Sequence, residues 1–522
     1  MTSANPPNLE TTTIGGVTDV PRLISGLWQL AGGHDTNVNV DDAAKCMDPL
    51  IDFHGLSPRN ITALTKWCPP ENGVKSFAQA KAAVDLACQR MGQEEIALMQ
   101  CSSASPIEQL DAKNLSTKRY HHARLTPRQR DMADHIWDYT DDTYWHNLCH
   151  LRTLQQQGRI RHVGLTNVDA AHLELILDSG FAIATNQLSC SVLDRRLVRG
   201  RLARLCAERG VGVLAYGALL GGFVSERWLG RPEPGDDGPA DGDGGSMNWS
   251  LRKYLRFIRA AGGWTAFQGV LGALAGVARK HDVAIAAVAL RYVLDIPAVS
   301  AVIVGCRLSR DSAEHARRNL AVFALRLDEE DYAAIRAAQE ALEDVPGDCG
   351  DEYRRRPYLT ATGDLSQHLA TSRREQIQKA VSAKCRIEYT SGSEWEPIAG
   401  YCRAVRTGNY VHVSGTTANS PIPAILPVLG GVSARSQTVA IFDIIGRALK
   451  ALGASLSDIV HTRVMIRNEL DCEDVSRAHG WVFKCEGIRP TNTLTVSGLI
   501  GREKLVEIEV EAELGFSDVT QV

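Results

Sequence analysis

Polar, aromatic and glycine residues that could bind a ligand recur at the ends of short apolar segments. They stand in the runs Gly164-Leu-Thr-Asn167, Asn186-Gln187, Ala215-Tyr-Gly-Ala-Leu219 and Val302-Ile-Val-Gly305, followed by Asn319. An amide side chain offers both a hydrogen-bond donor and an acceptor, and a tyrosine ring offers a flat surface for stacking. These residues are therefore candidates for contacts with a ligand.

The apolar segments alternate with helical stretches, which is the pattern of repeated strand–helix units and a parallel sheet. The candidate strands are Leu23–Leu27, Ile61–Trp67, Ile96–Gln100, Ile160–Asn167, Ile183–Leu188, Val211–Tyr216 and Ala301–Cys306. Their extent predicts an α/β fold of the (β/α)8, TIM-type barrel. The ligand-binding candidates then follow the carboxyl ends of the strands, where such barrels bind ligands.

In order, spacing and placement, these runs resemble the aldo-keto reductase family over about Ile14 to Glu340. The resemblance implies an oxidoreductase that uses NADP, or NAD as the alternative, to reduce an aldehyde or ketone of a small molecule. It also implies the cofactor contacts. These are Thr166, Asn167 and Gln187 at the carboxamide, Tyr216 on the nicotinamide ring, Gly217 and Leu219 at the pyrophosphate, and Gly305, Arg307 and Asn319 at the adenosine end. Either Arg307 or Arg310 could meet a 2′-phosphate.

Carbonyl reduction also needs a proton donor beside the carbonyl oxygen. The family uses a tyrosine that is activated by a lysine, with an aspartate behind the lysine and a histidine that orients the substrate. By resemblance the lysine is Lys66 and the histidine is His135. Asp131 matches the aspartate only in part, because Asp131-Met-Ala-Asp-His135 copies the start of the family motif D-x-A-x-x-Y-G but Ile136 stands where the tyrosine belongs. No residue carries over for the tyrosine, so we expect impaired activity.

The strand that should carry this motif has no room in the chain. Only Phe53–Asn60 separates the first helix from the strand that contains Lys66, whereas a parallel crossover needs about a dozen residues or more. Conversely, the polar segment Cys101–Asp134 is inserted where a strand should pass quickly into its helix. We therefore expect a barrel whose second strand–helix unit is missing near 50–60, and an exposed, irregular insertion at 101–134.

Three explanations of the missing unit stay open. The first is that exon boundaries are misassigned at both segments. The second is that the chain is an inactive nucleotide-binding relative. The third is that a substitute acid has been recruited. The candidates for such an acid are Tyr139, Tyr144 and His54.

From Arg386 the pattern changes to paired strands and two helices. The last strand, Leu505–Leu514, alternates apolar residues with glutamates, which predicts a sheet with one face packed on the helices. The runs Val413-Ser-Gly415, Ile488-Arg-Pro-Thr-Asn-Thr493 and Val506-Glu-Ile-Glu509 resemble the Rid/YjgF family of imine and enamine deaminases, over about Cys385 to Phe516. The resemblance implies an α+β, chorismate-mutase-like domain that forms trimers with clefts between subunits.

In that family an arginine clamps the substrate carboxylate and a glutamate helps to position water. Glu507 stands at the glutamate position, but Asn492 stands at the arginine position. An amide cannot make the bidentate cationic clamp that a carboxylate needs. Asn492 and Glu507 are therefore candidates for binding a neutral imine or amide.

These patterns predict a barrel at 14–343, a linker at 344–384 and a Rid/YjgF-like domain at 385–516. Within the linker, the cluster Arg354-Arg-Arg-Pro357 is interpreted as a solvated face. The favoured function is an NAD(P)H-dependent oxidoreductase fused to a domain that handles imines or other ligands. The alternatives are a Rid-type hydrolase with a degenerate barrel and a non-catalytic nucleotide-binding protein.

Composition narrows the classes of partner. A formal charge of −4 provides no basic field for non-specific nucleic-acid binding. The 13 cysteines form no C-x-x-C pair, so we expect no metal site and reduced thiols. The polar stretch Met1–Gly16 and the interrupted apolar stretch Val283–Cys306 predict a cytoplasmic protein without a membrane span. The expected partners are a small carbonyl substrate and further copies of the chain.

Overall fold

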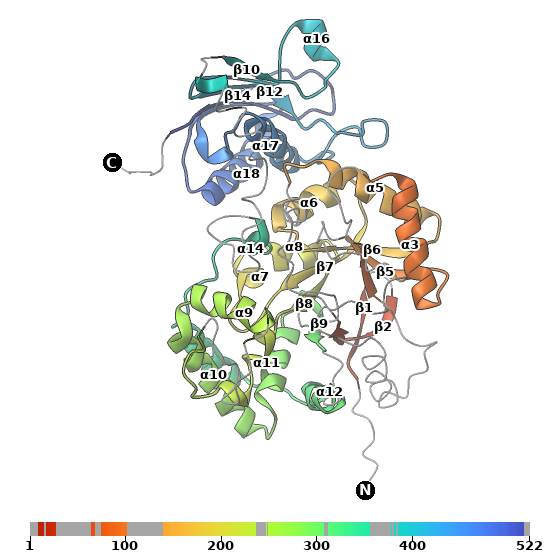
Figure 1. Ribbon diagram of the computed structural model, residues 1–522, viewed down its shortest axis with the longest axis vertical. Helices are drawn as coiled ribbons and strands as arrows, with labels where there is room; N and C mark the ends of the chain where they lie inside the picture. The colour runs from red at the N-terminus through yellow and green to blue at the C-terminus, as the bar shows by residue number, and fades with distance from the viewer. Residues whose placement is uncertain are drawn as a thin grey trace, which may run out of the picture.

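A barrel-like domain and a smaller sandwich of one sheet and two helices make up the computed structural model (Figure 1). The structure describes residues 9–14, 17–27, 64–67, 75–101, 139–235, 247, 249–306, 312–354, 377, 380–382 and 385–515. The sequence-predicted loop Phe53–Asn60, nearly all of the insertion 101–134, and the site candidates Asp131, His135 and Arg307 lie outside these ranges.

Seven parallel strands form the curved sheet of the first domain, as the sequence predicts. Their order is β3 (Leu23–Gly26), β9 (Val299–Gly305), β8 (Gly212–Tyr216), β7 (Ile183–Ser189), β6 (Ile160–Thr166), β5 (Ile96–Cys101) and β4 (Leu64–Trp67). The first strand pairs with the last, as in a closed barrel, but no strand of the described residues lies between β3 and β4. Within the described residues the sheet is thus open between β3 and β4, where the sequence predicts a missing strand–helix unit.

Helices cover the outside of this sheet. They are α3 (Phe77–Met91), α5 (Thr143–Gln156), α6 (Ala170–Asp178), α7 (Arg196–Arg199), α8 (Leu202–Glu208), α9 (Trp249–Ala260), α10 (Gly263–Lys280), α11 (Ile285–Leu294), α12 (Ser312–Leu320), α13 (Glu329–Gln339) and α14 (Asp351–Arg354). The start of α3 is a capping box between Ser76 and Gln79, and Gly92 ends the helix with a left-handed φ of 62°.

A short hairpin that sequence analysis missed covers one end of the barrel. Its strands are β1 (Thr11–Ile14) and β2 (Val17–Pro21). Ile14 and Val20 are buried against apolar side chains of the parallel strands, among them Leu98 and Leu214. The hairpin therefore fills the barrel interior at this end, which leaves the carboxyl ends of the strands as the ligand face.

The C-terminal domain is a mixed sheet with helices on one face. Its strands, in spatial order, are β10 (Arg386–Tyr389), β11 (Ala404–Thr407), β12 (Tyr410–Thr417), β15 (Val506–Glu513), β13 (Ile459–Ile466) and β14 (Thr491–Val496). The short helix α16 (Trp395–Ala399) precedes β11, and α17 (Ala434–Ala451) and α18 (Cys472–Glu486) cover the sheet. The predicted alternation of β15 is confirmed, because Val506, Ile508, Val510 and Ala512 are all buried.

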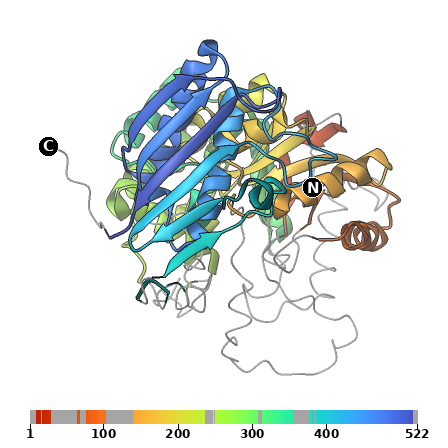
Figure 2. The ribbon, with the colours of Figure 1, turned by 90° about the horizontal axis from the view of Figure 1, so that it is seen from above.

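The helices of the C-terminal domain lie between its sheet and the barrel, so the other face of the sheet points away from the barrel (Figures 1 and 2). Helix α17 packs against α6 of the barrel, and the contact is strongly polar. Arg435 pairs with Glu174 at 3.0 Å, and Arg447 pairs with Asp142 at 2.5 Å. The two domains thus form a single body through matched charges.

Residues 344–354, the start of the predicted linker, pack against the barrel. Cys349, Asp351 and Glu352 are buried against the barrel. Arg354, which we expected on a solvated face, has a side chain only 5% exposed and pairs with Asp169 and Asp351. A buried guanidinium is tolerated here because carboxylates and a carbonyl oxygen surround it.

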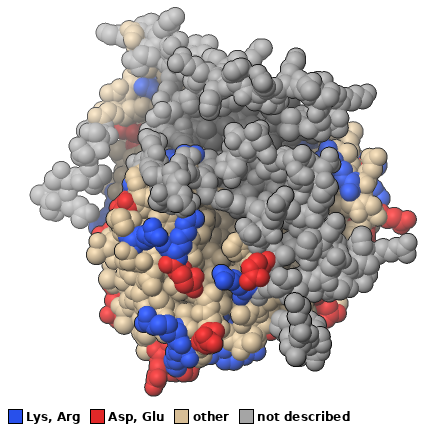
Figure 3. All heavy atoms as spheres, turned by 60° about the horizontal axis from the view of Figure 1, so that its bottom comes forward, with Lys and Arg blue, Asp and Glu red and all other residues tan. Residues whose placement is uncertain are grey.

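On the surface shown in Figure 3, basic and acidic side chains of the described residues are interspersed, as suits a small net charge. Among the described helices, none has the length and apolar character needed to cross a membrane.

A buried histidine joins the two domains. His172 of α6 contacts Asp169 at 2.8 Å and Asp443 of α17 at 3.2 Å, and its ring stacks on Tyr139. Burial alone would lower the pKa of His172, but the two carboxylates raise it to about 9. A charged imidazole therefore bridges the domains at neutral pH.

Because His172 joins the two domains as a cation, we expect the folded protein to lose stability at alkaline pH. The pKa of His172 is higher in the folded protein than in the unfolded chain, so its contribution is complete below about pH 6.5 and disappears as the pH rises through 9. We expect this contribution of His172 to the free energy of unfolding to be roughly 3 kcal/mol. Urea unfolding of the wild type and of His172→Gln, from pH 6 to 10, measures it. Identical pH dependence in the two proteins would contradict the assignment.

Candidate functional site

The residues predicted to hold a planar, amide-bearing ligand converge at the carboxyl ends of β6, β7 and β8. The backbone N–H of Asn167 donates to the carbonyl oxygen of Gln187 at 2.9 Å. The Tyr216 hydroxyl donates to Asn167 Oδ1, also at 2.9 Å. Thr166, Asn167 and Gln187 are buried, while Tyr216 is half-buried. These residues therefore lie together at the strand ends, and their binding of a ligand stays a prediction.

Asn167 adopts an unusual backbone conformation at the centre of this group. Its φ is 59°, in the left-handed region that residues other than glycine rarely occupy. Two contacts hold it there. Arg354 Nη1 donates to the Asn167 carbonyl oxygen at 2.5 Å, and Asn186 Nδ2 donates to the carbonyl oxygen of Val168 at 2.7 Å. Strain that neighbouring groups maintain in this way is typical of functional sites.

A glycine-rich turn follows β8 beside Tyr216. Gly217, Gly221 and Gly222 all have positive φ values, of 77°, 68° and 111°. A Cβ atom on Gly217 would lie 2.7 Å from the hydroxyl of Tyr254, so a larger residue would be both strained and obstructed. Leu219, the other predicted pyrophosphate contact, lies in this turn. The lack of a side chain at Gly217 and Gly221 lets Tyr254 pack closely against the turn.

The predicted adenosine end lies on the neighbouring strand. Ile303 of β9 pairs with Tyr216 of β8, and Gly305 ends β9 two residues later. Asn319 is on α12, the next helix along the chain, and is partly buried. The described cofactor candidates thus follow the order β6, β7, β8, β9 across the sheet, which is the order that one elongated ligand would require.

The predicted catalytic residues are only partly placed. Lys66 lies on the edge strand β4, where it pairs in register with Gln100 of β5, and its side chain is exposed. The proposed substitute acids Tyr139 and Tyr144 are both buried in the core. Burial raises the pKa of each phenol, and the Tyr139 ring stacks on His172 at the domain contact. Neither therefore faces the ligand group, and His54 lies outside the described residues.

Sequence analysis missed a lysine–tyrosine pair that closes one side of the group. Lys253 of α9 donates through Nζ to the hydroxyl of Tyr353 at 2.8 Å. The Tyr353 hydroxyl lies 3.2 Å from the Tyr216 hydroxyl. Lys253 is 4% exposed, and its Nζ lies 5.2–5.4 Å from the ring centroids of Tyr216, Tyr254 and Tyr353. No spacing rule could have joined Lys253 and Tyr353, which are one hundred residues apart.

Buried ion pairs hold the segment that carries Tyr353. Arg196, which follows β7, donates to Asp194 Oδ2 at 2.7 Å and to Glu352 Oε2 at 2.6 Å. All three side chains are 1% exposed. Arg196 also donates to the carbonyl oxygen of Asp348 at 2.9 Å. Because every charge in this set has an opposite partner, α14 is fixed at the end of the barrel.

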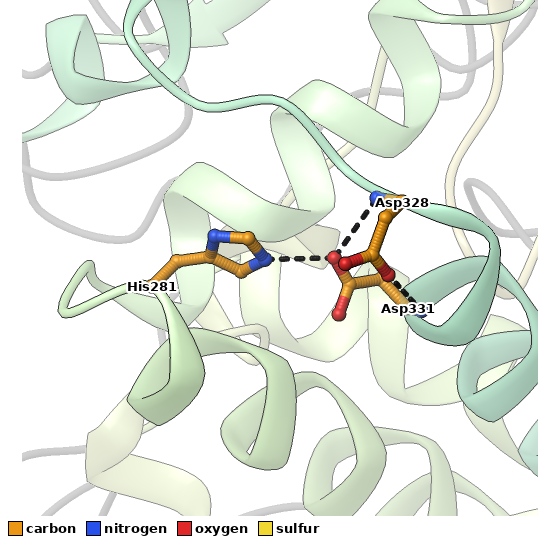
Figure 4. Close-up of side chains that lie close together, drawn as sticks. All are labelled: His281, Asp328 and Asp331. Atoms are coloured by element: carbon orange, nitrogen blue, oxygen red, sulfur yellow. Dashed lines mark hydrogen bonds and ion pairs between the residues drawn. The ribbon is translucent and has the colours of Figure 1, made fainter.

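One group of side chains elsewhere has ligands of the type that metals use. His281, Asp328 and Asp331 lie together on the outer helices (Figure 4), with ligand atoms within 4.8 Å of one another. Lys280 Nζ bonds Asp328 at 2.5 Å and Asp331 at 2.9 Å, and the two aspartates form the capping box of α13. These contacts account for the cluster as a helix cap neutralised by lysine, and we assign no metal to it.

In the C-terminal domain, the two predicted ligand residues lie on different strands. Asn492 of β14 is exposed, and its Oδ1 accepts from Thr462 at 3.0 Å. Glu507 of β15 pairs with Met465 of β13, so β13 separates the two residues within one chain. Burial, followed by the charge of Glu509, raises the pKa of Glu507, although Arg403 opposes the shift.

Arg403 is a further residue that sequence analysis missed. It is buried beside Glu507 and donates to the carbonyl oxygen of Gly415 at 2.6 Å. A side chain on Gly415 would collide with the Glu507 carboxylate. The small residue in Val413-Ser-Gly415 therefore makes room for Glu507.

Comparisons with known proteins divide the chain in the same way. The profile of the Aldo/keto reductase family matches residues 58–340, more than half of the chain. A second profile, described as Endoribonuclease L-PSP, matches residues 391–514. The NADH-specific methylglyoxal reductase of Escherichia coli K12 is 24% identical over 352 residues, which cover 63% of this chain and 98% of that protein.

Two further relatives match shorter parts. Flagellar radial spoke protein 5 of Chlamydomonas reinhardtii is 35% identical over 144 residues, but the match covers 27% of this chain and 26% of that protein. This chain therefore spans about a quarter of the length of that relative. A solved structure of a YjgF/YER057c/UK114 family member from Mycobacterium tuberculosis is 34% identical, and the match covers 25% of this chain and 99% of that one, with a TM-score of 0.22.

Proposed function

The chain belongs to the aldo/keto reductase family and carries a C-terminal YjgF/Rid domain, and from this premise we propose that its barrel binds a nicotinamide dinucleotide and reduces the carbonyl group of a small molecule. The observation that carries the proposal is the group formed by Asn167, Gln187 and Tyr216. Its members come from three adjacent strands and meet at their carboxyl ends.

The residues of this group fit a nicotinamide. Its carboxamide needs both donors and acceptors, which the amides of Asn167 and Gln187 and the hydroxyl of Thr166 supply. Its ring needs a flat neighbour, which Tyr216 supplies. The pyrophosphate needs a closely approaching backbone, which the turn that begins at Gly217 supplies.

When bound, the reduced nicotinamide supplies the hydride, and the chain supplies orientation and charge. Tyr216 fixes which face of the ring is open, while Asn167 and Gln187 fix its rotation. We propose NADP as the cofactor, because Arg307 or Arg310 could pair with a 2′-phosphate. NAD is the alternative, and the name of the Escherichia coli relative states NADH specificity.

Binding of the dinucleotide is the first property to test. We expect Tyr216→Ala to weaken NADPH binding about tenfold or more, because the ring loses its stacking partner. Tyr216→Phe should bind more tightly than Tyr216→Ala, since it keeps the ring and loses only the hydroxyl. Quenching of protein fluorescence by NADPH and by NADH measures both affinities and the cofactor preference.

The control is Tyr332→Phe, since Tyr332 bonds Asp295 on the outer helices, away from the strand ends. Equal nucleotide affinity in the wild type and Tyr216→Ala would contradict the site, and no measurable binding by the wild type would contradict the function.

A second candidate function belongs to the C-terminal domain, as hydrolysis of a neutral imine at Asn492 and Glu507. The raised pKa of Glu507 favours it, because a carboxyl group that gains a proton more readily suits proton transfer to and from water. The absence of an arginine at position 492 argues against a 2-imino acid as substrate.

We also propose that this domain assembles the chain into a trimer. One sheet face is covered by α17 and α18, while the other presents Tyr410, His412 and Glu511 to solvent. In a ring of three, one patch meets a different patch, so the glutamates of β15 need not face one another. Light scattering of the full chain should give three times the chain mass. A clean monomer at micromolar concentration would remove this proposal.

A further inference from the structure

The proposed reduction needs a proton as well as a hydride, and the residue that supplies this proton is not among those predicted from the sequence. The hydroxyl of Tyr216 donates to Asn167 Oδ1, so its own proton is directed away from a substrate. Tyr139 and Tyr144 are buried in the core. Two phenols remain beside the described strand ends of the group, those of Tyr254, which is buried, and Tyr353, which is half-buried.

We propose that Tyr353 is the proton donor of the reductase site and that Lys253 is the positioning residue that holds its hydroxyl in place. The inference rests on the proposed function and assigns a residue of that same site. It places the acid on α14, a segment that follows the barrel in the chain, and not on a barrel strand.

The geometry supports an acid at this position. Tyr353 is half-buried, whereas Lys253 behind it is almost completely buried, and the Tyr353 hydroxyl lies between the Lys253 ammonium and the Tyr216 hydroxyl. The Lys253 ammonium lies 2.8 Å from the phenol oxygen, in a region where burial strengthens the attraction between charges. A cation so close stabilises the negative charge that the oxygen gains when it gives up its proton.

Its position relative to the cofactor group is also suitable. The Tyr353 oxygen lies 3.2 Å from the oxygen of Tyr216, the ring on which the nicotinamide is proposed to stack. An acid at the edge of the Tyr216 ring can reach the carbonyl oxygen of a substrate whose carbonyl carbon lies over the stacked rings. General acids act within about 2.6–3.2 Å of the atom that they protonate.

Lys253 keeps its charge in these surroundings. Burial alone would lower the pKa of Lys253, but its neighbours Tyr353, Tyr254 and Glu352 raise it above the ordinary value. The ammonium is therefore present throughout the neutral range, in line with the geometric argument.

A bound reduced nicotinamide would supply the hydride that forms the new C–H bond at the carbonyl carbon, and it would itself be oxidised. The π electrons of the carbonyl move to its oxygen, which takes the proton from Tyr353 as the phenol O–H bond breaks. The alcohol leaves, and the phenolate beside the Lys253 ammonium regains a proton from water.

The principal test is the variant Tyr353→Phe in the full-length chain, with methylglyoxal and a series of simple aldehydes as substrates. We expect kcat to fall about 10²–10⁴-fold, the usual cost of losing a positioned general acid. The dissociation constant for NADPH should stay within about twofold of the wild type, because the ring of Tyr353 remains. Tyr332→Phe, on the outer helices, is the control and should leave both values unchanged.

A binding measurement provides a readout that does not depend on turnover. Propionamide offers a carbonyl oxygen but cannot be reduced by hydride transfer under these conditions. Tyr353→Phe should weaken its binding to the complex of the protein with NADPH about tenfold, the value of one hydrogen bond near a charge. Lys253→Met should lower kcat and move the pH profile of kcat, whereas loss of a merely structural contact would lower the folded fraction without moving the profile.

Different outcomes would show whether the proposed function or the role of Tyr353 is wrong. A wild type that binds no nicotinamide dinucleotide overturns the proposed function. A wild type that binds the dinucleotide but reduces no aldehyde overturns the role of Tyr353. The same conclusion follows if Tyr353→Phe, with a wild-type circular dichroism spectrum, keeps the wild-type kcat.

Discussion

The site depends on a buried triad of charged side chains that forms two ion pairs. Arg196 stands between Asp194 of the barrel and Glu352 of the segment that follows the barrel, and all three side chains are excluded from water. Removing one member of such a set leaves an unpaired buried charge, which is strongly unfavourable. The pairing therefore determines where α14 lies, and with it the position of Tyr353 beside Tyr216.

A second carboxylate connects this site to the C-terminal domain. Asp169 pairs with Arg354, which supports the strained backbone of Asn167, and also with His172, which contacts Asp443 of α17. The two domains and the ligand face of the barrel thus share charged groups. The chain is built as one body, although its two halves match separate families.

Much of this arrangement was predictable from local pattern, and the rest was not. Strands such as β7 and β15 could be predicted because their apolar periodicity reflects burial directly, and Asn167, Gln187 and Tyr216 were found because they end such strands. The Lys253–Tyr353 pair was missed because it joins distant segments. Arg354 was misinterpreted because the burial of a charge is decided by its partners and not by its residue type. Among the described residues no strand lies between β3 and β4, and the missing strand–helix unit stays a prediction.

The Arg196 ion pairs hold residues 347–354 at the proposed reductase site. Amide hydrogen exchange of this segment in Arg196→Met tests it most directly. The control is Arg204→Met, whose side chain is 73% exposed and pairs with Glu208. We predict that Arg196→Met loses protection in this segment, and carbonyl reduction with it, while the strands β6 to β8 stay protected. Unchanged protection and unchanged turnover in Arg196→Met would contradict the account.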